Sequence, residues 1–439
     1  MIVRNWLIMG AVALGPTMAA VGQDTAPAMP AIDVWGDFPR VDAGRPFKPL
    51  DGAWPSRVRI DDAAGMGVIV PVMTPILRPE GRRVGMQFPT RLIAEVPDAA
   101  VLLGDRAFRV LTEGAGAFVV RAEPAPEGTP VPRRQQNLAA ETFRFVSGQP
   151  IEPDVVRIER TWFAYFPPVA GSQAGAESPV LAGVVLLMPG MFGTPETVLD
   201  GLSRSLRGRG LGVLRMIAQP GRFTERLDLT LNPGEALPTL VAGAAREFDS
   251  REAECAYAAE EAWKYLAKVK PETAGVPRVI VGFSAGAITL PTVVARTPGM
   301  YAAAVAVGGG CHWWLLNEKS NYRTMIDAIN VTWTTPPADA DLHAAREAYL
   351  DASVLDPFNT SQVLRGMPVV MIQGASDLAV PSPLGDCLWE RAGKPERWMV
   401  EGGHEVLFMQ LSGYYERIGA WVTARVEEAA AMKHPQEAK

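Results

Sequence analysis

The sequence predicts an α/β protein with a doubly wound, mostly parallel sheet, and three observations support this prediction. After about residue 138, apolar segments of strand length alternate with segments of helical character. Residues 180–188 are almost entirely apolar, as expected for a strand whose sheet carries helices on both faces. The pentapeptide Gly-Phe-Ser-Ala-Gly, at residues 282–286, stands between an apolar strand segment and an Ala-rich helical segment.

The individual elements follow from the periodicity of apolar residues and from start and stop signals. Strands are expected at residues 141–146, 155–166, 180–188, 211–217, 278–283, 302–307, 368–373 and 397–400. Helices are expected at residues 195–207, 247–269, 285–295 and 405–428. Thr194 is expected to cap the first of these helices, with Pro195 at its first position. Pro291 lies inside the third helix, where a proline removes a backbone hydrogen bond and favours a kink.

The chain is expected to divide into four parts. Residues 1–22 combine an early arginine, a short apolar run and small residues, which is typical of a secretory signal peptide, so we expect export to the periplasm or secretion. The apolar run is too short for a stable membrane span. Residues 23–138 predict an extended lead-in and a small β-rich domain, because short β-like runs are punctuated by glycine and proline. Residues 139–430 form the α/β domain, and residues 431–439 a flexible tail.

A lid-like insertion is expected at about residues 312–360. There the alternation of strand and helix is interrupted by a stretch rich in tryptophan and polar residues. Its position predicts that it lies over the C-terminal edge of the sheet.

Composition excludes several classes of protein. The formal net charge is −6 over 439 residues, which argues against nucleic acid as a partner. Three cysteines, Cys255, Cys311 and Cys387, are too few for a disulfide scaffold and contain no Cys-x-x-Cys metal pair. One disulfide with one free thiol, for example between Cys311 and Cys387, and three buried free thiols both remain open, with the second slightly favoured.

Ser284 is the predicted nucleophile. Residues 282–286 match Gly-x-Ser-x-Gly, in which the serine sits on a strained turn between a strand and a helix. A Cβ atom at position 282 or 286 would collide with the neighbouring strand or helix. The alternative is a glycine-rich turn without chemical importance.

The chain has four histidines, and His404 is the predicted general base. It follows a predicted strand through a glycine-bounded loop and precedes a helix, in the chain order serine, acid, histidine. His312, in a loop after another strand, is the competing candidate. His343 and His434 lie in polar stretches that favour the surface.

Asp377 is the predicted acid that orients the histidine. It lies between Ser284 and His404 and comes just after the predicted strand at 368–373. Asp386 is the reserve candidate. An aspartate that only caps a turn is the alternative interpretation of Asp377.

Two backbone N–H groups are expected to form an oxyanion hole. The first belongs to Ala285, directly after the nucleophile and at a helix N-terminus. The second is expected from Met191, in the loop that follows residues 180–188. An ordinary strand–helix turn is the alternative for this loop.

A substrate pocket is expected beside these residues, with large aromatic side chains forming an apolar wall. Trp333, which lies in the predicted insertion at about residues 312–360, belongs to the same group of aromatic residues. The alternative is that the tryptophans are core residues beneath the insertion. The predicted pocket residues are Phe192, His312, Trp313 and Trp314.

Residues from about 140 to 428 resemble the α/β-hydrolase family through residues 282–286, Asp377 and His404 in the family's order. Where the family's oxyanion loop often begins with histidine, this chain has Pro189, followed by Gly190. The resemblance implies an eight-stranded, mostly parallel sheet and acyl transfer through an acyl-enzyme. It implies a serine hydrolase without cofactor or metal.

The favoured partner is a small-molecule or polymeric carboxylic ester, because esters are easier acyl donors than amides. Two alternatives stay open. One is a secreted serine peptidase or amidase of the same fold. The other is a non-catalytic binding protein on a hydrolase scaffold, because this fold hosts many functions.

Overall fold

The computed structural model describes residues 35, 37–55, 58–59, 74–77, 83–87, 92–94, 100–103, 106–110, 120–122, 141–152, 155–169, 181–191, 194–217, 227–234, 236–323 and 329–433. The predicted signal peptide, Phe192, His434 and the end of the predicted tail lie outside these residues. The chain divides into two units, Met1–Phe38 and Pro39–Lys439. Every element below belongs to the second unit.

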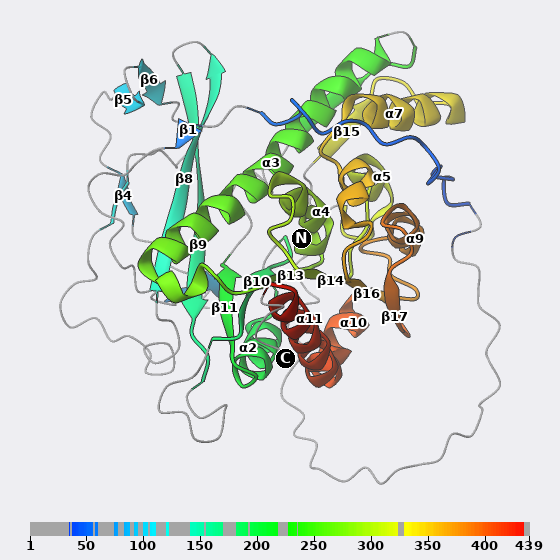
Figure 1. Cartoon of the computed structure of the whole chain (residues 1–439). Coiled ribbons are helices and arrows are strands. Elements are labelled where there is room, and N and C mark those ends of the chain that lie inside the picture. Colours follow the sequence, from blue (N-terminus) through cyan, green and yellow to red (C-terminus); the bar gives the residue numbers. More distant parts are fainter. Residues whose placement is uncertain are drawn as a thin grey trace, which may run out of the picture. The chain divides into compact units, whose positions relative to one another are not determined.

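A large, mostly parallel sheet forms the centre of this unit (Figure 1). Eight of its strands follow one another in the order β8-β9-β11-β10-β13-β14-β16-β17. β9 is antiparallel to both β8 and β11, and the pairs from β11 to β17 are parallel. These strands are β8 (Glu141–Glu152), β9 (Val155–Phe166), β10 (Gly183–Met188), β11 (Leu211–Met216), β13 (Arg278–Phe283), β14 (Ala303–Val307), β16 (Val369–Gly374) and β17 (Glu396–Val400). The predicted mostly parallel sheet is therefore confirmed.

Short strands from the N-terminal region extend the sheet or pair with each other. β1 (Val58–Arg59) pairs with β8, and β6 (Arg106–Val110) pairs with both β9 and β5 (Ala100–Leu103). Two further pairs are β2 (Thr74–Leu77) with β3 (Arg83–Gln87), and β4 (Leu92–Ala94) with β7 (Val120–Ala122). The region is rich in strands, as predicted. A domain boundary near residue 138 stays a prediction.

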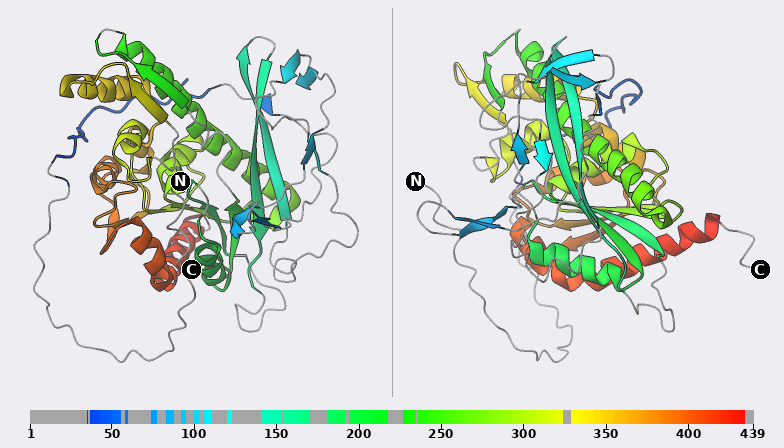
Figure 2. Two further views of the ribbon diagram at one scale, coloured as in Figure 1. Left: turned by 180° about the vertical axis from the view of Figure 1, so that it is seen from behind. Right: turned by 90° about the vertical axis from the view of Figure 1, so that its left-hand side faces the viewer.

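Helices cover both faces of the sheet (Figure 2). α2 (Glu196–Arg207) and α11 (Tyr415–Lys433) lie side by side on one face, where their apolar side chains pack on alternate residues of the strands. α3 (Leu237–Val269) and α4 (Ala285–Arg296) cover the other face. Strand residues such as Val281 and Val305 are fully buried, and each such side chain contributes about 1.5–3 kcal/mol relative to exposure. Burial on two faces explains why the central strands have no polar alternation.

In the described residues, the predicted insertion contains α5 (Trp313–Lys319), β15 (Ile329–Trp333), α7 (Asp339–Ala352) and α8 (Pro357–Thr360). The 3-10 helix η3 (Ser361–Leu364) follows it directly. β15 pairs in parallel with β12 (Leu227–Leu231), and α7 packs against α3. The Lys48 ammonium group donates to the carbonyls of Leu350, Asp351 and Ser353, which compensates the C-terminal end of α7. A role of this region as a lid stays a prediction.

Three of the differences from the sequence prediction concern where helices begin and end. α3 begins at Leu237, ten residues early, because Pro238 occupies its first turn, where proline is tolerated. The predicted C-terminal helix is divided into α10 (His404–Gln410), the 3-10 helix η4 (Leu411–Tyr414) and α11. Thr194 does not cap α2, because Pro195 is the N-cap residue and the Thr194 hydroxyl accepts from the Gly190 N–H instead.

The remaining helices among the described residues are the 3-10 helix η2 (Pro271–Thr273) and α9 (Ser382–Arg391). Among the helices in the described ranges, none has the length and apolar character that a bilayer crossing requires. The three cysteines are buried thiols outside any disulfide, which was the favoured prediction.

Candidate active site

The carboxyl ends of neighbouring strands bring the predicted catalytic residues to one edge of the sheet. β13 pairs with β14, β14 with β16, and β16 with β17, all in parallel. Ser284 follows β13, Asp377 lies just beyond β16, and His404 opens α10 after β17. Because parallel strands end at the same edge, residues far apart in the chain meet there.

Ser284 sits on a strained turn between β13 and α4. Its backbone angles are φ 51° and ψ −116°, a conformation that residues other than glycine rarely adopt. The turn is held by a hydrogen bond from the Ser284 N–H to the Val307 carbonyl at 2.8 Å, and the Ser284 carbonyl accepts from Ala287 and Ile288. Strain of this kind persists only where the surroundings enforce it. It is the geometry of a nucleophile elbow.

The two glycines that flank Ser284 are required by close backbone contacts. A Cβ atom at Gly282 would lie 2.3 Å from the Gly286 carbonyl oxygen. A Cβ atom at Gly286 would lie 2.4 Å from the Met188 carbonyl oxygen. Both obstacles are backbone atoms, so no side chain can move aside. The predicted collisions at positions 282 and 286 are therefore confirmed.

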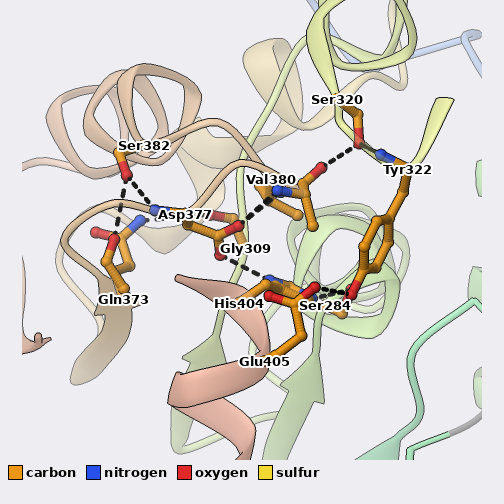
Figure 3. A network of polar contacts seen from close by, with 12 residues as sticks. Ser284, Gly309, Ser320, Tyr322, Gln373, Asp377, Val380, Ser382, His404 and Glu405 are labelled. Carbon is orange, nitrogen blue, oxygen red and sulfur yellow. Dashed lines mark hydrogen bonds and ion pairs between the residues drawn. The ribbon is translucent and has the colours of Figure 1, made fainter. Parts of the chain in front are cut away.

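The side chains of Asp377, His404 and Ser284 form a hydrogen-bonded series (Figure 3). His404 Nδ1 lies 2.6 Å from Asp377 Oδ2, and His404 Nε2 lies 3.0 Å from Ser284 Oγ. Because an ionised carboxylate only accepts, it places the ring proton on Nδ1 and leaves Nε2 free to accept from the serine hydroxyl. His404 and Asp377 are only 6% and 3% exposed, so little water competes for these bonds.

The loop after β16 holds the Asp377 carboxylate in a fixed orientation. Its second oxygen, Oδ1, accepts from the backbone N–H groups of Ala379 and Val380, both at 2.9 Å. The Ser382 side chain accepts from the Asp377 N–H at 3.0 Å and opens α9. Oδ1 therefore accepts hydrogen bonds from the loop, and Oδ2 accepts from His404.

The reserve candidates for acid and base lie elsewhere. Asp386 is on α9, where its exposed carboxylate pairs with Arg397. His312 is buried and stacks on Tyr349, with ring centroids 5.6 Å apart. His343 lies on α7 beside the N-terminal segment. The structure thus brings together Ser284, His404 and Asp377 and separates them from these alternatives.

The predicted oxyanion-hole residues lie on two segments that touch beside the elbow. Ala285 is the first residue of α4, so its N–H belongs to the helix N-terminus. Met191 lies in the turn after β10, and the preceding carbonyls of Met188 and Pro189 pass directly against Gly286. The bond from the Gly190 N–H to the Thr194 hydroxyl shapes this turn. Phe192, the neighbouring pocket candidate, lies outside the described residues.

Tyr322 and Glu405 belong to the site but were missed in the sequence. The Tyr322 ring lies edge-on to the His404 ring, with centroids 6.1 Å apart, and its hydroxyl donates to the Glu405 carboxylate (Figure 3). Burial and the neighbouring Glu405 raise the pKa of Tyr322, so its hydroxyl stays protonated. Phe408 packs against the His404 ring from α10. Adjacency to His404 could have indicated Glu405, but no sequence signal indicates Tyr322.

His312 and Trp313 are buried, as the alternative interpretation of the tryptophans as core residues expects, and their role in a substrate pocket stays a prediction. The backbone N–H groups of both residues donate to the Asp356 carboxylate, which fixes the start of α5. The Trp313 indole N–H donates to Glu252 on α3 at 2.6 Å, so this side chain points into the core. Trp314 is 5% exposed and lines a separate cavity together with Trp333.

The buried carboxyl of Glu252 makes the stability of this core dependent on pH. Burial raises the pKa of its carboxyl well above the usual range, with smaller effects from the hydrogen bond of Trp313 and the charge of Asp356. A group whose pKa is higher in the folded than in the unfolded state contributes stability that is present below the unfolded pKa. That contribution is lost as the pH rises toward the folded pKa.

We therefore expect Glu252→Gln to flatten the pH dependence of stability. Above about pH 4.3, the ordinary glutamate pKa, Glu252 opposes folding increasingly, by up to about 1.4 kcal/mol per pH unit. Glutamine keeps a side-chain oxygen that accepts from the Trp313 indole N–H, but it does not titrate. The free energy of unfolding, measured in denaturant at pH 5 and pH 8, should fall less in the variant than in the wild type. Equal decreases would show that Glu252 is not neutral in the fold.

Comparisons with known proteins find similarity among solved structures. The esterase domain of a Rhodothermus marinus protein is 15% identical, and the match covers 60% of this chain and 93% of that chain at a TM-score of 0.36. Est1E from Butyrivibrio proteoclasticus is 12% identical over 61% of this chain and 95% of that chain, with a TM-score of 0.38. A Pyrococcus horikoshii acylaminoacyl peptidase is 12% identical over 70% of this chain and 45% of that chain, with a TM-score of 0.41. No protein-family model and no curated protein match.

The described residues have the α/β-hydrolase fold: a mostly parallel sheet flanked by helices, with a serine elbow after a central strand. The predicted resemblance is thus confirmed at the level of the fold. In the described part of the chain, no three histidine, cysteine, aspartate or glutamate side chains are grouped to hold a metal ion.

Proposed function

We propose that this chain is a serine hydrolase that cleaves carboxylic esters through an acyl-enzyme intermediate. The observation that supports this most directly is the hydrogen-bonded series of Asp377, His404 and Ser284, with the serine on a strained elbow. This arrangement deprotonates a serine hydroxyl at the moment of attack, and it needs no metal or cofactor. The substrate is a small-molecule or polymeric ester.

In the acylation step, His404 Nε2 takes the proton of Ser284 Oγ as the oxygen attacks the ester carbonyl carbon. The carbonyl oxygen becomes an oxyanion, which the N–H groups of Ala285 and Met191 stabilise. As the tetrahedral intermediate collapses, the imidazolium returns its proton to the leaving alkoxide. The products are the free alcohol and the Ser284 acyl ester.

Deacylation repeats these steps with water as the nucleophile. His404 accepts a proton from water as the hydroxide attacks the acyl carbon, and then returns it to Ser284 Oγ. Asp377 stays ionised and stabilises the imidazolium in both steps. Its burial and its two backbone donors favour a fixed orientation of the histidine ring.

The alternatives from the sequence remain distinguishable. A peptidase or amidase of the same fold would use the same residues, and esters are favoured because they are easier acyl donors. A non-catalytic binding protein would have no need for a buried acid, a histidine and a strained serine in series. The hydrogen-bonded series therefore favours an enzyme.

We also propose that the enzyme is exported. Residues 1–22 have the layout of a secretory signal peptide, and we infer a periplasmic or secreted enzyme. N-terminal sequencing of the protein isolated from its native host tests this. A start near residue 21 or 23 is expected, and a mature chain that retains Arg4 would contradict export with cleavage.

A fluorophosphonate probe tests the enzyme class. The probe reacts with activated serines, so we expect one covalent adduct, located at Ser284 by peptide mass spectrometry. A denatured sample and Ser284→Ala serve as controls. Absence of labelling in the folded chain would favour the binding protein. Hydrolysis of anilides at rates similar to the matched esters would favour the amidase.

A further inference from the structure

A cavity of about 300 Å³ lies between α5, β15 and α7. Its volume is within the range of small-molecule sites. It is separate from the hydrogen-bonded series at Ser284. Its walls include the apolar side chains of Trp314, Ile329, Val331, Trp333 and Leu342.

Two indole rings from different elements line this cavity. Trp314, on α5, is 5% exposed and packs against Tyr349 at a centroid distance of 6.0 Å. Trp333, at the end of β15, is half-buried and lines the same space. Aromatic walls favour a ligand that carries a ring with an apolar face.

The polar side chains around the cavity are largely engaged within the protein. The Asn317 side chain bonds both the N–H and the carbonyl of Ile329, at 3.3 and 2.7 Å. Glu318 accepts from Arg346, and Asn330 donates to Asp228 at 2.7 Å. A sugar ring would bring several hydroxyls that require partners, and burying them unpaired is costly. An aromatic ring makes no such demand.

One short segment connects this cavity with the candidate active site. Tyr322 faces His404, and the next residue, Arg323, lines the cavity. The Ser320 hydroxyl donates to the Ala379 carbonyl at 2.6 Å, which ties the segment to the loop that holds Asp377. Figure 3 shows the Tyr322 side chain next to His404, with Ser320 on the same segment near Val380. Two consecutive residues of this segment thus contact His404 and line the cavity, respectively.

We propose that this cavity binds an aromatic ring of the substrate, on either its acyl or its alcohol side. The chain is then an esterase for aryl-substituted esters, with Trp314 and Trp333 as specificity-determining residues. The link to hydrolysis rests on the proposed function, whereas ring binding does not.

Steady-state kinetics on three esters test the proposal. Methyl 3-phenylpropanoate carries a ring on the acyl side, 2-phenylethyl acetate carries one on the alcohol side, and methyl butanoate carries none. Trp333→Ala should lower kcat/KM for an aryl ester, relative to methyl butanoate, by about 10–100-fold. Trp333→Phe keeps an aromatic face and should restore part of the ratio. An unchanged ratio for both aryl esters in folded Trp333→Ala would overturn the proposal.

Trp389→Ala is the matched control. Trp389 is also a half-buried tryptophan, but it lies on α9, where its indole N–H donates to the Pro395 carbonyl. Its replacement should leave the ratio unchanged. Circular dichroism confirms folding of each variant, and if Trp333→Ala does not fold, Trp333→Leu replaces it in the same comparison.

Binding without turnover separates this inference from the proposed function. The Ser284→Ala protein should bind the 3-phenylpropanoate anion by calorimetry, and Trp333→Ala in the same background should abolish binding. If the wild type hydrolyses none of the three esters but this binding is found, the function fails and the cavity assignment stands. If cellobiose binds and 3-phenylpropanoate does not, the aromatic assignment is overturned.

Discussion

Replacement of Ser284 by alanine is expected to lower kcat for hydrolysis of methyl butanoate on the order of 10⁶-fold. The change removes the oxygen that forms the acyl-enzyme and leaves only binding and the oxyanion hole to act on the ester. The variant retains the backbone hydrogen bonds of the elbow. The N–H of residue 284 donates to the Val307 carbonyl, and the N–H groups of Ala287 and Ile288 donate to the carbonyl of residue 284. The side chain loses one hydrogen bond, to His404, so the free energy of unfolding should change by only about 1 kcal/mol.

Ser205→Ala is the matched control for this change. Ser205 is a serine of α2 whose hydroxyl donates to Glu416, remote from the sheet edge that carries the site. It should leave kcat unchanged and, like Ser284→Ala, should change the free energy of unfolding by only about 1 kcal/mol, since one hydrogen bond is lost. If Ser284→Ala retained most of the wild-type rate while folded, another residue would be the nucleophile and the proposed function would be wrong.

The elbow could be predicted from the sequence because its requirements are local. Gly282 and Gly286 are needed by contacts within a few residues or with the adjacent strand end, so the pattern and its strand–helix context carry the information. The positions of Asp377 and His404 follow from one further rule, that parallel strands end at one edge. That rule selected Asp377 over Asp386 without any knowledge of the side-chain contacts.

The surroundings of the triad could not be predicted because they depend on packing between distant segments. His312 and Trp313 follow the strand next to the nucleophile strand, which made them pocket candidates. The Asp356 carboxylate, more than 40 residues away, holds the start of α5 so that these side chains enter the core. The same helix then returns the chain to the site at Tyr322, where the contact with His404 depends on the path of the whole insertion.

Asp377→Asn is expected to lower kcat by about 10⁴-fold while the chain stays folded. The reason is the way in which the loop constrains the side chain. The N–H groups of Ala379 and Val380 both donate to Oδ1, so an asparagine at this position must place its carbonyl oxygen there. Its NH₂ group then faces His404 Nδ1, at the position that Oδ2 occupies in the wild type.

An NH₂ group donates a hydrogen bond to Nδ1 and thereby forces the ring proton onto Nε2. In that tautomer His404 cannot accept the proton of Ser284, and the positive charge that forms during attack has lost its carboxylate. Asp386→Asn removes the same charge from an exposed ion pair with Arg397 and should leave kcat nearly unchanged. Steady-state kinetics compare kcat of the two variants, and thermal melts confirm that both are folded. A greater loss in Asp386→Asn than in Asp377→Asn would mean that the acid has been misassigned.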